Sequence, residues 1–312
     1  MESVNGKECG AVGAKEPVFI GYPNRHARLA DLDIARALPI RERRLVGPWC
    51  FLDRFGPLSF TSEQPMNVPP HPHIGLQTVS WLLEGEVLHS DSLGSVAVGR
   101  PGGVNVMTAG YGISHSEETP EKNSGRLNGV QLWVALPESA RHMAPSFTHV
   151  EQVPRADTRA GILQVFVGAK NGAASPAPCY SEIVGLDIQV HAASELELDL
   201  DREYEHALLV LGGDCSFEKN KLEERMLYYL GSSRSSLSLT SRSGSRVLLI
   251  GGPPFPEKVL MWWNFVARTP DEIAQARADW ESERRFGQVV GRHAPRLTAP
   301  DLVRFAQPNP AS

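Results

Sequence analysis

Residues 71–94 read HPHIGLQTVSWLLEGEVLHSDSLG, a segment that opens with two histidines separated by one residue. Apolar residues recur at every second position, at Val79, Trp81 and Leu83, and glycines lie on both sides of this run. Alternation with a period of two predicts a β-strand that is buried on one face. Because residues i and i+2 of a strand point to the same face, His71 and His73 should project together into one barrel interior.

A second pair with the same spacing closes residues 100–117, which read RPGGVNVMTAGYGISHSE and end on His115 and Glu117. Three imidazoles and one carboxylate form a ligand set that suits Fe(II), Mn, Ni, Cu or Zn. Such a set leaves coordination positions open for a substrate or dioxygen, which is typical of a catalytic metal site. The alternative is that these histidines are ordinary surface or core residues. The second pair, in a glycine-punctuated strand, favours the metal site.

The rest of the chain is typical of a β-rich protein. The 312 residues include 28 glycines and 24 prolines, which favours many short strands over a helical bundle. A chain of this length is expected to form about two domains. Short apolar runs that end in glycine recur at residues 162–168, 207–213 and 246–252 and predict a second series of strands. Leu237 and Leu239 alternate within a serine-rich stretch, which we interpret as a further strand.

One helix is predicted late in the chain, within residues 269–287. Thr269 is a suitable N-cap, Pro270 follows it, and Glu272 completes a capping box, while Gly287 supplies a stop. The face predicted to pack against a barrel carries Ile273, Ala276 and Trp280.

The charge balance and the cysteines exclude several classes of protein. A net charge of −5 argues against direct nucleic-acid binding. The sequence contains no apolar run of about 20 residues and no signal peptide at its start, so we expect no membrane contact. The cysteines are widely spaced, without a CxxC pair, which favours a reducing, cytoplasmic setting. They are Cys9, Cys50, Cys179 and Cys215.

The two histidine blocks resemble the signature blocks of the pirin family, within the cupin superfamily. The resemblance extends upstream to residues 47–57, GPWCFLDRFGP, and downstream through residues 246–280 to Arg285–Gly287, so that it covers roughly residues 18–287. It implies an all-β fold of two tandem cupin β-barrels with the C-terminal helix packed against them. The implied organisation is a flexible leader (1–17), a metal-binding barrel (18–150), a metal-free barrel (151–268), the helix (269–287) and a tail (288–312).

The resemblance also implies a mononuclear iron in the N-terminal barrel. Carried over by motif position, its ligands are His71, His73, His115 and Glu117. We expect Fe(II), with Mn, Ni, Cu, Co or Zn as alternatives. In the second barrel, His206 has Leu208 at i+2 and no partner pair, so we interpret it as structural.

The first block departs from the family pattern at Ile74, Leu76 and Gln77, where the family has arginine, phenylalanine and glutamate. The neutral amide of Gln77 supplies no charge to a metal, which supports Glu117 as the carboxylate ligand. We place Gln77 next to the ligands, where it would influence the choice of metal. His89 is expected to face solvent or line the pocket.

Two further pairs have a less specific sequence context. Met107 and Tyr111 are equally consistent with the pocket entrance and with ordinary loop packing. Trp262 and Trp263 have few basic neighbours, so we expect core or inter-domain packing rather than a stacking platform for nucleic acid.

The activity implied by the resemblance is that of a quercetin 2,3-dioxygenase, which cleaves a flavonol ring with O2, with Glu117 as general base. The alternative is an iron-dependent, redox-sensing regulatory protein that contacts transcription factors or metabolic enzymes. A cavity that can hold a three-ring flavonoid above the metal favours the enzyme, and a plugged cavity favours the regulator. We expect a monomer.

Overall fold

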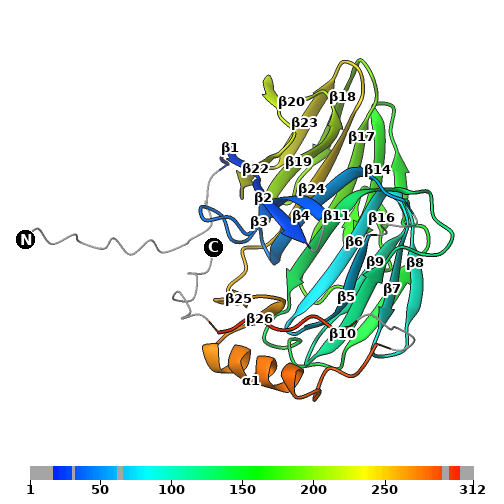
Figure 1. Ribbon diagram of the computed structural model, residues 1–312. Coiled ribbons are helices and arrows are strands. Elements are labelled where there is room, and N and C mark those ends of the chain that lie inside the picture. The colour runs from blue at the N-terminus through cyan, green and yellow to red at the C-terminus, as the bar shows by residue number, and fades with distance from the viewer. Residues whose placement is uncertain (1–16, 30–31, 62–65, 290–294, 303–312) are drawn as a thin grey trace, which may run out of the picture.

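The computed structural model describes residues 17–29, 32–61, 66–289 and 295–302. Within these residues it is built from β-strands and a single α-helix, and the strands form two tandem barrels (Figure 1). The predicted all-β fold of two cupin barrels is therefore confirmed. The predicted leader and most of the predicted tail lie outside the described residues.

The N-terminal barrel is a seven-stranded sheet that faces a four-stranded sheet. The larger sheet has the order β12 (Ser146–Val150), β9 (Val104–Thr108), β6 (Leu76–Gly85), β11 (Arg126–Ala135), β4 (Trp49–Ser59), β3 (Leu32–Leu38), β2 (Arg25–Leu29). The smaller sheet has the order β5 (Asn67–His73), β10 (Ile113–Glu118), β7 (Val87–Asp91), β8 (Val96–Gly99). The strand predicted from alternation at Val79–Leu83 lies within β6.

The C-terminal barrel repeats this plan. Its larger sheet has the order β1 (Ile20–Pro23), β22 (Met226–Gly231), β19 (Glu205–Gly213), β24 (Ser245–Gly252), β17 (Val184–Val190), β14 (Gly161–Val167), β13 (Arg155–Asp157). Its smaller sheet has the order β18 (Ser194–Asp199), β23 (Ser236–Ser241), β20 (Cys215–Phe217), β21 (Asn220–Leu222). The serine-rich stretch forms β23, as predicted.

Two short hairpins complete the strands, and the pairing of β1 changes one predicted boundary. β15 (Ala169–Lys170) and β16 (Ala173–Ala174) form one hairpin, and β25 (Leu260–Trp262) and β26 (Phe265–Ala267) form another. β1 pairs with β22, so a strand that was assigned to the N-terminal barrel belongs to the sheet of the C-terminal one. Local patterns predict a strand, but they do not predict a pairing partner 200 residues away.

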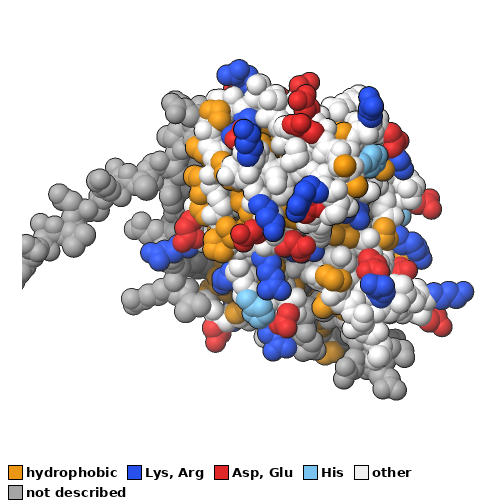
Figure 2. All heavy atoms as spheres, turned by 90° about the horizontal axis from the view of Figure 1, so that it is seen from above, with side chains coloured by type: hydrophobic (Ala, Val, Ile, Leu, Met, Phe, Trp, Pro, Cys, Tyr) orange, Lys and Arg blue, Asp and Glu red, His pale blue; other side chains and the backbone are white. Residues whose placement is uncertain are grey.

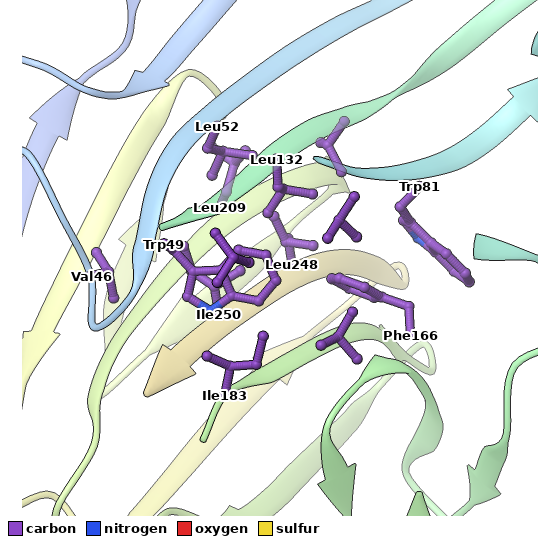
Figure 3. Close-up of a cluster of buried hydrophobic side chains, with 14 of the residues drawn as sticks. Val46, Trp49, Leu52, Trp81, Leu132, Phe166, Ile183, Leu209, Leu248 and Ile250 are labelled. Atoms are coloured by element: carbon purple, nitrogen blue, oxygen red, sulfur yellow. The ribbon is translucent and has the colours of Figure 1, made fainter. Parts of the chain in front are cut away.

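The two larger sheets pack face to face and share a hydrophobic core. Figure 3 shows Trp49, Trp81 and Leu132 of the N-terminal barrel facing Phe166 and Leu248 of the C-terminal barrel, all of them buried. These contacts explain the alternation in β6, because its odd-numbered apolar residues point into this shared core. The even-numbered residues of β6 are left to face the interior of the N-terminal barrel.

The helix α1 (Pro270–Glu281) lies below the N-terminal barrel in Figure 1. Its predicted capping box is present: the Thr269 side chain accepts from the Glu272 amide, and the Glu272 carboxylate accepts from the Thr269 amide. The three residues of the predicted packing face are buried. The helix is shorter than predicted, because the chain turns at Ser282 and folds back so that Phe286 packs against Trp280.

The remaining features concern the surface and the cysteines. Figure 2 shows acidic and basic side chains interspersed over the visible face. The helix α1, with its 12 residues, is too short and too polar to cross a membrane, and it is the only helix among the described residues. Cys50, Cys179 and Cys215 are free thiols.

Candidate metal centre

The three predicted histidines lie on two neighbouring strands of the N-terminal barrel. β5 and β10 are antiparallel, and their register places His71 directly opposite His115. His73 lies two residues along from His71 on the same face of β5. One ring nitrogen from each histidine can be chosen so that all three lie within 4.8 Å of one another, and all three side chains are buried. The structure therefore brings the two sequence blocks together at one point.

The Nδ1 atom of each histidine is occupied by another part of the chain. His71 Nδ1 donates to the Pro69 carbonyl at 2.9 Å, and His73 Nδ1 donates to the Asn264 carbonyl at 3.0 Å. His115 Nδ1 lies 3.3 Å from His89 Nδ1. Carbonyl oxygens only accept, so the first two histidines carry their proton on Nδ1 and direct the lone pair of Nε2 inward.

His89 and Asp91 indicate that His115 also carries its proton on Nδ1. His89 Nε2 lies 3.1 Å from the Asp91 carboxylate, so this nitrogen donates and His89 Nδ1 is left as an acceptor. His115 Nδ1 must then donate to His89. The Asp91 carboxylate also accepts from the amides of Leu93 and Ser95, which hold it in place. A carboxylate that orients a histidine behind a ligating histidine is a common feature of metal sites.

This arrangement fits a metal ion. Burial lowers the pKa of His71 to about 4 and lowers the pKa values of His73 and His115 well below the usual range, so all three imidazoles are neutral at pH 7. The Nε2 atoms of His73 and His115 are 3.1 Å apart, although neither carries a proton to share. Two nitrogens bound at about 2.1 Å and at right angles to one metal ion would be about 3.0 Å apart.

Glu117 lies on the same strand but outside this cluster. The pairing of β10 with β5 shifts register between His115 and Glu117, and the three-histidine group does not include the Glu117 carboxylate. Glu117 is partly buried and lines the cavity in front of the histidines, where Ser80 Oγ approaches it at 3.5 Å. Burial raises the pKa of Glu117, and the nearby Ser80 hydroxyl opposes the rise.

Comparisons with known proteins agree with this geometry. Residues 31–134 match the Pirin family, and residues 185–287 match the Pirin C-terminal cupin domain. A "Pirin-like protein" of Caulobacter vibrioides is 37% identical over 271 residues, 84% of this chain and 93% of its own. The chain belongs to the pirin family.

Two further relatives carry the name of an enzyme. A Pseudomonas aeruginosa protein named "Putative quercetin 2,3-dioxygenase" is 42% identical to this pirin-family chain over 294 residues, 90% of this chain and 93% of its own. The crystal structure of a quercetin 2,3-dioxygenase from Acinetobacter baumannii superposes with a TM-score of 0.90 at 38% identity. That match covers 93% of this chain and 97% of the other.

A cavity of about 390 Å³ opens in front of the three histidines. Its size lies within the range of about 300–1,000 Å³ that is typical of small-molecule sites. Most of its wall is apolar, and half of the residues that line it come from the larger sheet of this barrel. Trp263 and Asn264 also line it, from the two-residue turn between β25 and β26. The same turn therefore supplies a cavity wall and the carbonyl that holds His73.

Several sequence expectations about the surroundings of this pirin-family site are wrong. His89 is buried and stacks on Phe147 with ring centroids 4.1 Å apart, so it faces neither solvent nor the cavity. Gln77 does not adjoin the three histidines: its amide donates to Thr108 and to the Pro178 carbonyl. The reason is the period of β6, since Gln77 points to the opposite face from Ser80.

Of the other residues that the sequence singled out, some only pack in the protein and one lines the cavity. Met107 is buried in a core cluster and Tyr111 stacks under Arg285, and neither lines the cavity. Trp262 and Trp263 pack against a core cluster, as expected, but Trp263 also faces the cavity. His89 and Asp91 share the i, i+2 spacing of the ligand pairs, and this signal could have identified them. Trp263 has no comparable local signal.

In the second barrel the described residues form no cluster of this kind. His206 is buried, its Nδ1 has no hydrogen-bond partner among the described residues, and it lines a cavity of about 120 Å³. Burial lowers the pKa of His206 to about 4. A single neutral imidazole does not make a metal site.

Proposed function

We propose that this pirin-family protein is a metal-dependent dioxygenase of the quercetin 2,3-dioxygenase type, which cleaves a flavonol with O2. The observation that carries the proposal is the convergence of three neutral imidazoles on one side of an open, mostly apolar cavity. The names of the relatives support the same reaction class. The open cavity also favours the enzyme over the redox-sensing regulator, because a regulator has no need of a space of substrate size.

The proposed ligands are His71, His73, His115 and Glu117. Fe(II) is the metal that we expect, and Mn, Ni, Cu, Co or Zn suit the same donors. When bound, the metal supplies open coordination positions for the flavonol hydroxyl and O2. Glu117 needs a change of rotamer to join the three imidazoles, because its carboxylate now lies beside Ser80.

The residues around the cavity would then exclude water and accept a proton from the substrate. The apolar wall excludes water from the flavonol rings, and the buried imidazoles stay neutral. Glu117 is the candidate general base, since it lines the cavity and its pKa is raised. A carboxylate with a higher pKa is a stronger proton acceptor. It would accept the proton of the flavonol 3-hydroxyl. We propose that the protein acts as a monomer.

The decisive experiment measures metal content and oxygen uptake on anaerobically purified protein. We expect one metal per chain, and oxygen consumption when a flavonol is added. His73→Ala should remove most of the metal because it deletes one of three converging nitrogens, whereas the exposed His142→Ala should change nothing. Wild-type protein that is loaded with metal but consumes no oxygen with any flavonol would contradict the proposed activity.

A paired variant tests Glu117 separately. Glu117→Ala should lower metal content if the carboxylate is a ligand, and Glu117→Gln should lower the rate of oxygen uptake if it is the base. Full metal content in Glu117→Ala would remove Glu117 from the ligand set. An unchanged rate in Glu117→Gln would remove it as the base.

A further inference from the structure

The floor of the cavity contains a row of polar residues that crosses four strands. In the larger sheet, Gln131 of β11 lies opposite Ser80 of β6 on one side and Asp53 of β4 on the other. Asp53 in turn lies opposite Arg36 of β3. Directly opposed residues of antiparallel strands project from the same face, and all four line the cavity.

Hydrogen bonds join the members of this polar row in two pairs. Ser80 Oγ donates to Gln131 Oε1 at 2.8 Å, and Arg36 holds Asp53 through Nε and Nη2 at 2.8 and 2.7 Å. At the other end Ser80 lies next to Glu117, the candidate base. The polar row, defined as Ser80, Gln131, Asp53 and Arg36, thus starts beside Glu117 and ends at a guanidinium.

The rows on either side of the polar row are apolar. One side carries Leu82, Phe55 and Ile34, which lie in register through Gly129, and the other carries Trp133 opposite Phe51. Polar groups in an apolar wall cost free energy unless a partner or a ligand satisfies them. A flat ligand that lies on this floor would therefore meet polar groups along one line only.

The ends of the polar row define the length and the chemistry of the occupant. Neighbouring strands are about 4.8 Å apart, so Ser80 and Arg36 are separated by three spacings, or about 14 Å. Arg36 lies over the Phe51 ring, with its guanidinium carbon 4.5 Å from the centroid. Asp53 is fully buried, whereas the Arg36 side chain is 21% exposed, so the cavity surface at this end presents the cation. No hydrogen bond engages Arg36 Nη1 among the described residues.

We propose that Arg36 is a specificity-determining residue. It binds a phenolic or carboxylate oxygen at the end of an elongated aromatic ligand, and the opposite end of that ligand faces the histidines. This inference rests on the proposed function for the end that meets the metal, and it adds a second recognition point. Arg36 suits the task because its planar group offers several donors and stacks on an aromatic ring. Asp53 positions Arg36 by occupying two of those donors.

The test compares ligands that differ by one hydroxyl, under nitrogen, with metal-loaded protein. The probes are unsubstituted 3-hydroxyflavone and two analogues with one additional hydroxyl, either on the terminal phenyl ring or at the far corner of the fused ring. Wild-type protein should bind one analogue about tenfold more tightly than the parent, which is typical of a hydrogen bond to a charged group. Arg36→Met should abolish that preference while it leaves the affinity for the parent within about twofold.

Two variants guard against an effect of misfolding. Removal of Arg36 alone leaves the buried Asp53 carboxylate unpaired, so Arg36→Met combined with Asp53→Asn serves as a second version of the test. Arg126→Met is the matched control, because Arg126 is an exposed arginine on β11 that pairs with Glu84 away from the cavity. This control should keep the full preference.

The outcomes separate this inference from the proposed activity. Equal affinity of wild-type protein for all three probes, no binding of any probe, or a preference that survives in both Arg36 variants would overturn the role of Arg36. A preference that depends on Arg36 but comes without oxygen uptake would leave the role of Arg36 standing and contradict the dioxygenase. Oxygen uptake without any preference among the probes would support the dioxygenase and overturn the role of Arg36.

Discussion

Each of the three clustered histidines has a partner that holds its Nδ1 proton, and the partners come from three different parts of the chain. Pro69 is on the same strand, Asn264 is in the hairpin turn after the second barrel, and His89 is on a neighbouring strand. These partners fix the tautomers before any metal arrives. The entropy cost of orienting the rings is therefore met when the protein folds.

His89 provides a sharp test at this scale. In His89→Leu the ring of His115 loses its acceptor, so we expect the affinity for the metal to fall by about 10–100-fold. His89→Gln, whose amide oxygen can accept, should recover part of the loss. Competition with a chromogenic chelator measures the affinity, with the exposed His142→Leu as control. Unchanged affinity in His89→Leu would contradict the assignment of the tautomers.

His206 predicts a pH dependence that is independent of the metal. The pKa of His206 is about 4 in the folded protein, against 6.5 in the unfolded chain, so the unfolded state binds more protons between these values. The stability that the neutral ring contributes is complete above pH 6.5 and is lost as the pH falls towards 4. Between pH 7 and 4 the free energy of unfolding should fall by about 3 kcal/mol more in the wild type than in His206→Gln.

Urea unfolding of metal-free protein at several pH values measures this difference. Parallel pH profiles of the wild type and the variant would show that His206 titrates normally in the folded state.

At the scale of elements, the hairpin of β25 and β26 contacts the end of β5, the strand that carries His71 and His73. Gly75 follows His73–Ile74 and has a φ of 68°, and a Cβ placed on it would lie 2.1 Å from the Val266 carbonyl oxygen of β26. The Val266 amide donates to the Ile74 carbonyl. Only glycine allows the hairpin to approach this closely and to deliver the Asn264 carbonyl to His73.

Gly75→Ala should therefore affect both stability and the site. We expect the free energy of unfolding to fall by about 2–4 kcal/mol, from the positive φ and the clash together, and metal content to fall with it. Gly94→Ala is the matched control, because Gly94 has a φ of 86° but a Cβ placed on it would meet no atom within 4 Å. It should cost about 1–2 kcal/mol and leave metal content unchanged. Equal metal content in both variants would show that the hairpin does not hold His73.

At the scale of the whole molecule, the two barrels share one core, and we expect them to unfold together. All six tryptophans lie outside residues 134–261, so fluorescence reports the N-terminal barrel, the core that it shares with the C-terminal barrel and the C-terminal segment, whereas far-UV circular dichroism reports both barrels. The two urea transitions should coincide. Leu248→Ala, in the C-terminal barrel, should shift both by the same amount and cost about 2–5 kcal/mol. Separate transitions would show that the barrels are independent.

The sequence alone predicted the elements that depend on local chemistry. Alternation predicted the strands, the threonine and glutamate of the capping box predicted the start of the helix, and two i, i+2 pairs predicted the histidine cluster. The helix is shorter than predicted because the chain folds back after Glu281 and the Phe286 ring packs against the Trp280 ring. No local pattern reveals this contact. Gln77 was misplaced because its distance along the chain from His73 says nothing about the face of the strand to which it points.

The tertiary structure decided which residues meet across strands and between distant segments. The contact of His89 with His115, the carbonyl that Asn264 gives to His73, and the line from Ser80 to Arg36 all depend on strand register or on segments up to 191 residues apart. Register is set by the shared core as a whole and by where each turn closes. The sequence by itself therefore determined the strands, the helix cap and the candidate ligands, and the packing of the two barrels decided what surrounds those ligands.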